Sequence, residues 1–161
     1  MFLSIILNNA IKIEVFKMRA YHSTTKKAAT IILNYGLLPG KNGGFTEDGS
    51  WADNIYGIRP IYVSLEPGKF EGEIILEIDV TDIKIYPDFP SLVHEGAYIE
   101  DDFMWFSEDD EPPLLKPFLN NDGEIYFYDI LHSDGIMLAI ITLTGTACIL
   151  DPVPPEKISV F

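Results

Sequence analysis

His22 and Tyr62 are the residues whose types and positions best suit chemistry in this sequence. His22 follows an apolar, strand-like run at residues 11–16, and an amphipathic helix begins directly after it. Tyr62 lies in a second strand-like run that ends on Ser64. An imidazole can both donate and accept hydrogen bonds, and a phenol joins a flat apolar ring to a polar tip. Presented from two short strands, the pair suits a pocket for a polar, aromatic, ribose-containing ligand.

The elements that must position this pair are one helix and a set of strands. Ser23 or Thr24 is a good N-cap and Gly36 is a good C′ residue, so residues 24–36 predict a helix of about three turns. Strand patterns follow at residues 61–65, 73–80 and 83–86, each bounded by Pro, Gly or Asp. Alternation within residues 73–80 places Ile74, Leu76, Ile78 and Val80 on one face and acids on the other, which predicts a sheet with one buried face.

Composition bounds the possible functions. The chain has 161 residues, 47% hydrophobic residues and a net charge of −14, so it can bury one sizeable core as a single domain spanning 1–161. This charge disfavours nucleic-acid binding, which draws its affinity from Lys and Arg on phosphates. Cys148 is the only cysteine, so the sequence predicts neither an internal disulfide nor a cysteine-based metal site. A reducing compartment is therefore expected, and the predicted location is the cytoplasm. Residues 1–7 predict a strand, and no apolar run is long enough for a membrane span.

An acidic excursion occupies about residues 87–121, the least regular part of the chain. Acids between Glu95 and Glu111 are interleaved with Tyr98, Phe103 and Trp105, a mixture too aromatic for a plain disordered linker. Three interpretations remain open. The segment is a solvated excursion fixed to the core by its aromatic residues, or a docking surface for a basic partner or a lid, or a cation site. The calcium-loop spacing is missing, and His94 and His132 have no metal-ligand spacing, so no metal site is predicted.

The C-terminal third returns to strand patterns. Residues 123–131 and 135–143 both favour buried, extended structure, although the second run also fits a helix. Between residues 36 and 53, glycines and polar residues predict a surface loop with Trp51 as its one bulky anchor. The last predicted core strand is 146–151, and the prolines from Pro152 onward end it.

Together, several short motifs resemble a known family by their order and spacing. They are residues 21–24 (Tyr-His-Ser-Thr), a helix ending at 35–38, a strand at 59–64 (Arg-Pro-Ile-Tyr-Val-Ser), a strand at 76–79 (Leu-Glu-Ile-Asp) and the closing run 153–158 (Val-Pro-Pro-Glu-Lys-Ile). They are similar to the landmarks of the ADP-ribosyltransferase fold, in the branch with a histidine-tyrosine signature. That branch includes poly(ADP-ribose) polymerases, DarT-type toxins and RNA 2′-phosphotransferases. The resemblance covers the chain from about Arg19 to its end.

This resemblance implies an NAD site. His22 would bond the adenosine ribose, the backbone at Ser23 would hold the nicotinamide carboxamide, and Tyr62 would lie against the nicotinamide ring. Thr24 and the rim hydroxyl of Ser64 would complete the cofactor-binding set. Arg59 matches an arginine that meets phosphate in the phosphotransferases. The histidine that those enzymes carry in the second strand is missing here.

The third element of the family signature differs in this chain. In the polymerases and the DarT-type toxins, a glutamate opens the last core strand and polarises the acceptor as positive charge develops at C1′. Thr146, or Ala147 with a one-residue shift, occupies that position here. Glu124, at the head of another strand, is a candidate substitute for the missing carboxylate. Poly(ADP-ribose) extension is therefore not expected, whereas transfer of one ADP-ribose, NAD hydrolysis and binding without catalysis stay open.

The predicted fold is α+β, an ADP-ribosyltransferase-like split, mostly antiparallel β-sheet with few short helices. The leading hypothesis for function is an NAD-dependent mono-ADP-ribosyltransferase, a small effector or toxin-like enzyme that modifies a protein. A second hypothesis, from a different class, is a non-catalytic interaction or inhibitor protein whose segment 95–111 engages a basic protein partner. A third is an RNA 2′-phosphotransferase.

Overall fold

The computed structural model describes residues 3–4, 14–15, 17–40 and 55–161. Of the predicted N-terminal strands, it describes β1 (Leu3–Ser4) and β2 (Glu14–Val15), which pair antiparallel with each other. Residues 41–53 of the predicted loop, with its anchor Trp51, lie outside the described residues.

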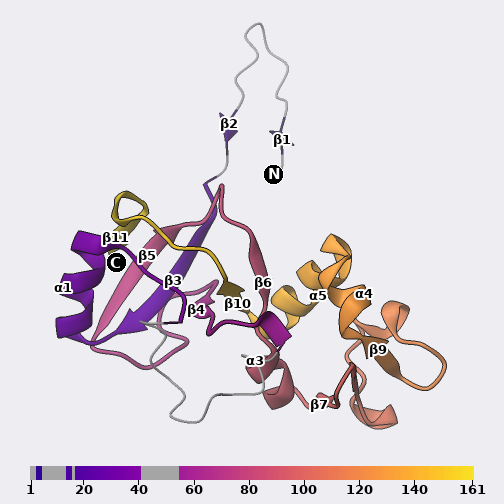
Figure 1. The fold of residues 1–161 in the computed structure, drawn as a ribbon. Helices are drawn as coiled ribbons and strands as arrows, with labels where there is room; N and C mark the ends of the chain where they lie inside the picture. The colour runs from indigo at the N-terminus through magenta and orange to yellow at the C-terminus, as the bar shows by residue number, and fades with distance from the viewer. Residues whose placement is uncertain (1–2, 5–13, 16, 41–54) are drawn as a thin grey trace, which may run out of the picture.

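A six-stranded sheet forms the body of the molecule, and we call it the main sheet (Figure 1). Its strand order is β11-β5-β3-β4-β10-β6, and every pairing in it is antiparallel. The prediction of an α+β fold with a mostly antiparallel sheet and few helices is therefore confirmed. The strands are β3 (Arg19–Thr24), β4 (Ile61–Ser64), β5 (Ile74–Asp79), β6 (Ile85–Pro87), β10 (Thr146–Ile149) and β11 (Ile158–Val160).

Helix α1 (Lys26–Tyr35) has its N-cap at Thr25, one residue after Thr24 and two after Ser23, the two caps that the sequence predicts. The Thr25 hydroxyl accepts a hydrogen bond from the Ala28 amide at 3.1 Å. Thr24 cannot cap the helix because it is still paired with Ile74 in the β3–β5 ladder. The helix ends at Gly36 as predicted, with φ of 86°, and a Cβ there would lie 2.3 Å from the Val153 carbonyl oxygen.

The first hydrophobic core lies between α1 and the main sheet. Ala29 and Ile32 are buried on the predicted apolar face of the helix, whereas Tyr35 is exposed. The predicted alternation in β5 is confirmed at Leu76 and Ile78, which are fully buried. The other buried members of this core are Ala20, Leu37, Ile61, Val63, Val80, Ile141, Ala147, Ile149, Val153 and Ile158.

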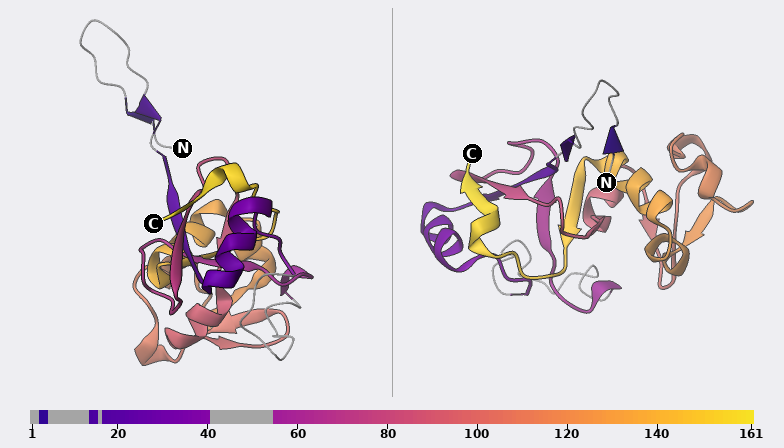
Figure 2. Two further views of the ribbon diagram at one scale, coloured as in Figure 1. Left: turned by 90° about the vertical axis from the view of Figure 1, so that its left-hand side faces the viewer. Right: turned by 90° about the horizontal axis from the view of Figure 1, so that it is seen from above.

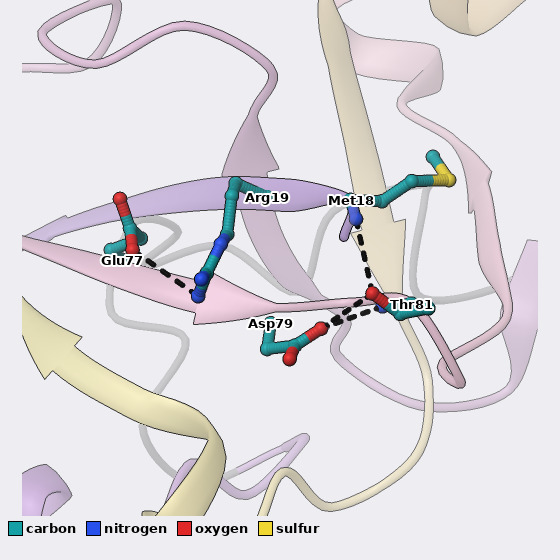
Figure 3. A network of polar contacts seen from close by, with 5 residues as sticks. All are labelled: Met18, Arg19, Glu77, Asp79 and Thr81. Atoms are coloured by element: carbon teal, nitrogen blue, oxygen red, sulfur yellow. Dashed lines mark hydrogen bonds and ion pairs between the residues drawn. The ribbon is translucent and has the colours of Figure 1, made fainter. Parts of the chain in front are cut away.

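Polar contacts fix the start of β3 against the end of β5 (Figure 3). Arg19 pairs with the Glu77 carboxylate at 3.2 Å, and the Met18 amide donates to the Thr81 hydroxyl at 3.0 Å. Thr81 in turn donates its hydroxyl and its amide to Asp79, at 2.7 and 3.1 Å, and these bonds lower the pKa of Asp79. They lock the register that continues along β3.

A second, three-stranded sheet lies at the other end of the molecule from α1 (Figures 1 and 2). Its strands, in the order β7-β8-β9, are β7 (Tyr98–Ile99), β8 (Phe103–Trp105) and β9 (Glu124–Tyr126). Helix α3 (Phe89–His94) and the 3₁₀ turns η1 (Glu108–Asp110) and η2 (Lys116–Phe118) belong to the same region.

This region folds around a core of its own, so residues 87–121 are more regular than the sequence suggests. Its aromatic and aliphatic side chains pack inward, because Phe89, Met104, Phe106 and Leu115 are all buried. The remaining buried members of this second core are Leu92, Ala97, Ile125, Ile130, Ile136, Met137 and Ile140.

Two helices replace extended structure that the sequence favours. The predicted strand 123–131 stops at Tyr126, where α4 (Phe127–Leu131) begins. The extended interpretation of residues 135–143 is wrong and the helical alternative is right, since α5 (Asp134–Thr144) covers them. Ser133 caps α5 by accepting from the Ile136 amide, and Gly145 ends it in the left-handed region. None of the helices in the described ranges is long and apolar enough to cross a membrane.

Candidate functional site

Three neighbouring strands of the main sheet carry most of the predicted site. β4 lies between β3, which holds His22, and β10, which holds Thr146. In the β4–β10 ladder Ser64 is directly opposite Thr146 and Tyr62 is opposite Cys148. The fold therefore brings His22, Tyr62 and Thr146 onto adjacent strands although they are far apart in the sequence.

The ladder between β3 and β4 is very short. Tyr21 opposite Ser64 is its single register pair, so continuing the ladder would place Ser23 opposite Tyr62. Instead, the His22 side chain meets the Tyr62 carbonyl, with Nδ1 2.9 Å from the oxygen. The imidazole thus takes the place of a backbone partner at the seam where the two strands part.

The hydrogen bond fixes the state of the His22 ring. A carbonyl oxygen can only accept, so Nδ1 carries the proton and, in the neutral ring, Nε2 is an acceptor. His22 is only 7% exposed, and this burial lowers its pKa. The hydrogen bond to the Tyr62 carbonyl raises the pKa by less, so the net direction is down. The ring is therefore held neutral at pH 7 with an acceptor nitrogen.

Strand alternation gives the two side chains different surroundings. His22 is opposite Leu76 and shares its face of the sheet with Ala20, both of them members of the first core. Tyr62 alternates with the core residues Ile61 and Val63, so its half-buried ring belongs to the other face of β4. His22 is thus linked to Tyr62 through the Tyr62 backbone.

The segment between β4 and β5 lies against the end of β3. The Ser23 hydroxyl donates to the Phe70 carbonyl at 2.8 Å, and the Thr24 carbonyl accepts from the Glu73 amide at 3.0 Å. A Cβ on Gly72 would be 2.8 Å from the Ser23 Cβ, so only glycine allows this close approach. Ser23 and Thr24, both predicted to touch a cofactor, serve this packing.

Ser64 and Thr146 are buried side by side, but only one of their hydroxyls is satisfied. The Ser64 hydroxyl donates to the Glu66 carbonyl at 2.6 Å. The Thr146 Oγ1 has no hydrogen-bond partner, and it is the only buried side-chain nitrogen or oxygen of this kind within the described ranges. Nearby, Lys69 donates to the Thr144 carbonyl, at the last turn of α5. A positive charge at a helix C-terminus is favourable.

The two remaining predicted residues lie outside this group. Arg59 precedes β4, and its carbonyl accepts from the Gly40 amide at 2.7 Å. Glu124 is in β9 of the three-stranded sheet, opposite Trp105, and its amide donates to the Asn120 side chain at 2.9 Å. The structure thus does not bring Glu124 together with His22, Tyr62 and Thr146.

Cys148 matches its predicted role as a buried thiol. It is fully buried in β10, and burial raises its pKa. Tyr56 lies close by and donates to the Pro87 carbonyl at 2.5 Å, and its own pKa is raised, mainly by burial. The Cys148 thiol and the Tyr56 phenol are therefore both protonated and uncharged at pH 7.

A groove of about 930 Å³ opens in the other half of the molecule, where the sequence alone predicts no pocket. It adjoins the turn between β7 and β8 and the junction of β9 with α4. Sequence reasoning missed Tyr126 and Tyr128 in its wall because residues 123–131 resemble a buried strand. The available signal is a run of three aromatic residues, Tyr126, Phe127 and Tyr128, of which the two tyrosines end in a polar hydroxyl.

Comparison with protein-family models, with curated proteins and with solved structures finds no match to this chain. The family resemblance of the short motifs therefore stays a prediction.

Proposed function

We propose that this protein binds NAD at the seam between β3 and β4 and transfers a single ADP-ribose to a protein acceptor. The observation that carries the proposal is the hydrogen bond from His22 Nδ1 to the Tyr62 carbonyl. It orients a neutral imidazole whose Nε2 can accept a hydrogen bond from a ribose hydroxyl.

The strand arrangement supports the same proposal. The resemblance expects a histidine strand, a tyrosine strand and a third strand with the catalytic position, and here β3, β4 and β10 are neighbours in that order. The single pair between β3 and β4 is consistent with the split sheet of the ADP-ribosyltransferase fold. The unpaired hydroxyl of Thr146 lies at the expected third position.

The chemistry asked of these residues is positioning. The glycosidic bond between nicotinamide and ribose breaks with its electron pair leaving on nicotinamide, and a lone pair of the acceptor forms the new bond to C1′. The acceptor then loses its proton to solvent. His22 would hold a ribose hydroxyl, with its ring oriented by the bond to the Tyr62 carbonyl. The Tyr62 ring belongs to the other face of β4, so we do not place it against the same NAD molecule. Because Thr146 replaces the usual glutamate, we propose no general base here and no chain extension.

A cytoplasmic setting accompanies the proposal, since the lone cysteine is a buried thiol and the substrate is an intracellular dinucleotide. The RNA 2′-phosphotransferase hypothesis ranks lower because of the net charge of −14 and the missing second histidine.

Calorimetric titration with NAD tests the proposal, with His22→Asn and His22→Ala compared. Asparagine keeps an N–H donor near the position of Nδ1 but has no counterpart of Nε2, so His22→Asn should keep the fold and lose at least about tenfold in NAD affinity. His132→Asn is the matched control, because His132 is exposed and its Nδ1 also meets a backbone carbonyl, that of Tyr128, at 2.7 Å.

Two results would overturn the proposal. One is absence of NAD binding by the wild-type protein. The other is an affinity that His22→Asn leaves unchanged, since His22 would then serve only the Tyr62 carbonyl. Release of nicotinamide from labelled NAD, measured with candidate acceptor proteins, separates transfer from binding alone.

A further inference from the structure

The groove near α4 has an apolar floor. Most of its lining is aliphatic or aromatic, and part of that lining is shared with the second core. The lining residues are Ile55, Val93, Ala97, Tyr98, Ile99, Glu100, Asp101, Asp102, Tyr126, Phe127, Tyr128 and Leu131. Such a surface can bury apolar groups of a ligand.

Three tyrosines in the groove are exposed while being held by neighbouring rings. Tyr98 is 51% exposed and stacks on Trp105 with ring centroids 4.3 Å apart. Tyr126 is 48% exposed and lies 5.9 Å from Phe103, again between centroids. Tyr128 is 71% exposed and stacks on the His132 ring at 4.1 Å. Rigid, exposed aromatic rings lose little entropy when a partner packs on them.

Three acids join these tyrosines in the turn between β7 and β8. Glu100, Asp101 and Asp102 are all exposed, and none of them forms an ion pair with another residue of the described ranges. The turn itself is anchored, because the Glu100 amide donates to the Phe103 carbonyl at 2.9 Å and the Phe127 amide donates to the Asp102 carbonyl at 3.0 Å. The backbone that carries the three carboxylates is therefore held in place.

The surrounding sequence has the same sign of charge. Residues 87–133, which we call the acidic region, hold twelve acidic residues and a single lysine, Lys116. Its formal charge is thus −11, out of −14 for the chain. The field of this region attracts positively charged partners and repels nucleic acid.

We propose that the groove is a docking site for a basic segment of a partner protein, in which Lys or Arg side chains alternate with apolar ones. The cations would meet Glu100, Asp101 and Asp102 and lie over the exposed tyrosines, while the apolar side chains would cover the floor. The acidic composition of the chain favours such a partner over a second copy of the chain. This binding does not depend on NAD.

The test measures binding of a short synthetic peptide of Lys, Arg and Leu by fluorescence anisotropy, against the same peptide with Glu in place of Lys and Arg. The groove variant combines Glu100→Gln, Asp101→Asn and Asp102→Asn. Its matched control combines Glu108→Gln, Asp109→Asn and Asp110→Asn, an equal change of charge in η1, whose residues are exposed and do not line the groove.

We expect the wild-type protein to bind the basic peptide and ignore the acidic one, with an affinity that falls as salt is added. The groove variant should bind at least about tenfold more weakly, and the control variant within about threefold of wild type. Tyr128→Ala should also weaken binding, since this ring is a surface contact whose loss leaves the core unchanged.

Equal losses in the two triple variants would overturn the proposal, because they would indicate attraction to net charge without a site. Loss of binding only in the control variant would place the site elsewhere. Analytical ultracentrifugation provides one more test. If the wild-type protein is a dimer and the groove variant is a monomer, the proposal is overturned, because the groove would then be occupied by a second copy of the chain.

Discussion

The main sheet and the acidic region differ in whether the polar side chains of their candidate sites are buried or exposed. In the main sheet, His22, Ser23, Ser64 and Thr146 are buried within strands, and three of these four side chains bond to backbone carbonyls. The rest of the chain outside the acidic region has a formal charge of only −3. In the acidic region, charged and aromatic side chains face solvent around a groove. A buried polar seam suits a small ligand, whereas an exposed groove suits a macromolecule.

Helix α5 is the element that these two parts share. Its residue Ile141 belongs to the first core, while Ile136, Met137 and Ile140 belong to the second. The helix also packs against β6 and β10 of the main sheet and against α3 and α4. The contrast in surface chemistry is thus built on one connected interior.

The largest expected effect tests whether the two parts unfold together. Phe89→Ala removes a fully buried ring from the second core and should cost about 3–5 kcal/mol of unfolding free energy. Leu76→Ala in the first core should cost about 2–5 kcal/mol. Because α5 joins the cores, we expect each variant to unfold in a single urea transition.

Amide hydrogen exchange provides the control for this prediction. In Phe89→Ala, protection should fall in β3 and β5 as well as in β8. Wild-type protection in β3 and β5 together with fast exchange in β8 would contradict a shared interior.

The helix caps reverse this contrast and offer a smaller test of it. Asp88, the N-cap of α3, is buried and accepts bonds from the Ser91 amide at 3.0 Å and the Ser91 hydroxyl at 2.7 Å. Thr25, the N-cap of α1, is exposed and accepts one bond. Thermal unfolding should therefore show a cost of about 1–2 kcal/mol for Asp88→Ala and about 0.5–1 kcal/mol for Thr25→Ala.

Asp88→Asn is the control for the cap, because it keeps an acceptor oxygen and should lose less stability than Asp88→Ala. A larger cost for Thr25→Ala than for Asp88→Ala would show that burial does not set the strength of these caps.

The sequence predicts the main sheet better than the acidic region, and local signals explain why. In strand β5 the apolar residues Leu76 and Ile78 alternate with acidic residues. Helix α1 has an N-cap residue at its start and Gly36 at its end, so each element is specified by its own residues. Helix α5 is apolar nearly all round, so its periodicity does not separate a buried strand from a buried helix.

The candidate sites divide in the same way. The sequence predicts that His22 and Tyr62 come from two short strands, and the structure places these strands, β3 and β4, side by side. The meeting of the β7–β8 turn with the start of α4 depends on tertiary packing, such as the bond from the Phe127 amide to the Asp102 carbonyl. No local pattern encodes that contact, so the sequence leaves a docking surface in segment 95–111 as one open interpretation but does not predict the groove.

The pH dependence of stability should report the buried histidine of the main sheet. Burial lowers the folded-state pKa of His22 below its usual value of 6.5, so the unfolded chain binds this proton first as the pH falls. The stabilising contribution is complete above about pH 6.5 and is lost below it, by at most about 1.4 kcal/mol per pH unit.

Urea unfolding between pH 7.5 and about pH 5 measures this effect against His22→Asn, which has no titrating ring. The loss of stability on acidification should be smaller in the variant than in the wild type. An identical pH profile for the two proteins would show that His22 is not the group responsible.

The smallest expected effect concerns the unpaired hydroxyl of Thr146. Thr146→Val keeps the β-branched shape and removes a buried group without a partner, so stability should stay equal or rise by up to about 1 kcal/mol. Ser64→Ala, directly opposite in the ladder, removes a satisfied hydroxyl and should cost about 1 kcal/mol. A clear loss of stability in Thr146→Val would mean that the hydroxyl is paired within the protein. If Thr146→Val is as stable as wild type but binds NAD more weakly, the Thr146 hydroxyl contacts the ligand. The main sheet would then differ from the acidic region in having one buried polar atom that bonds to a small molecule.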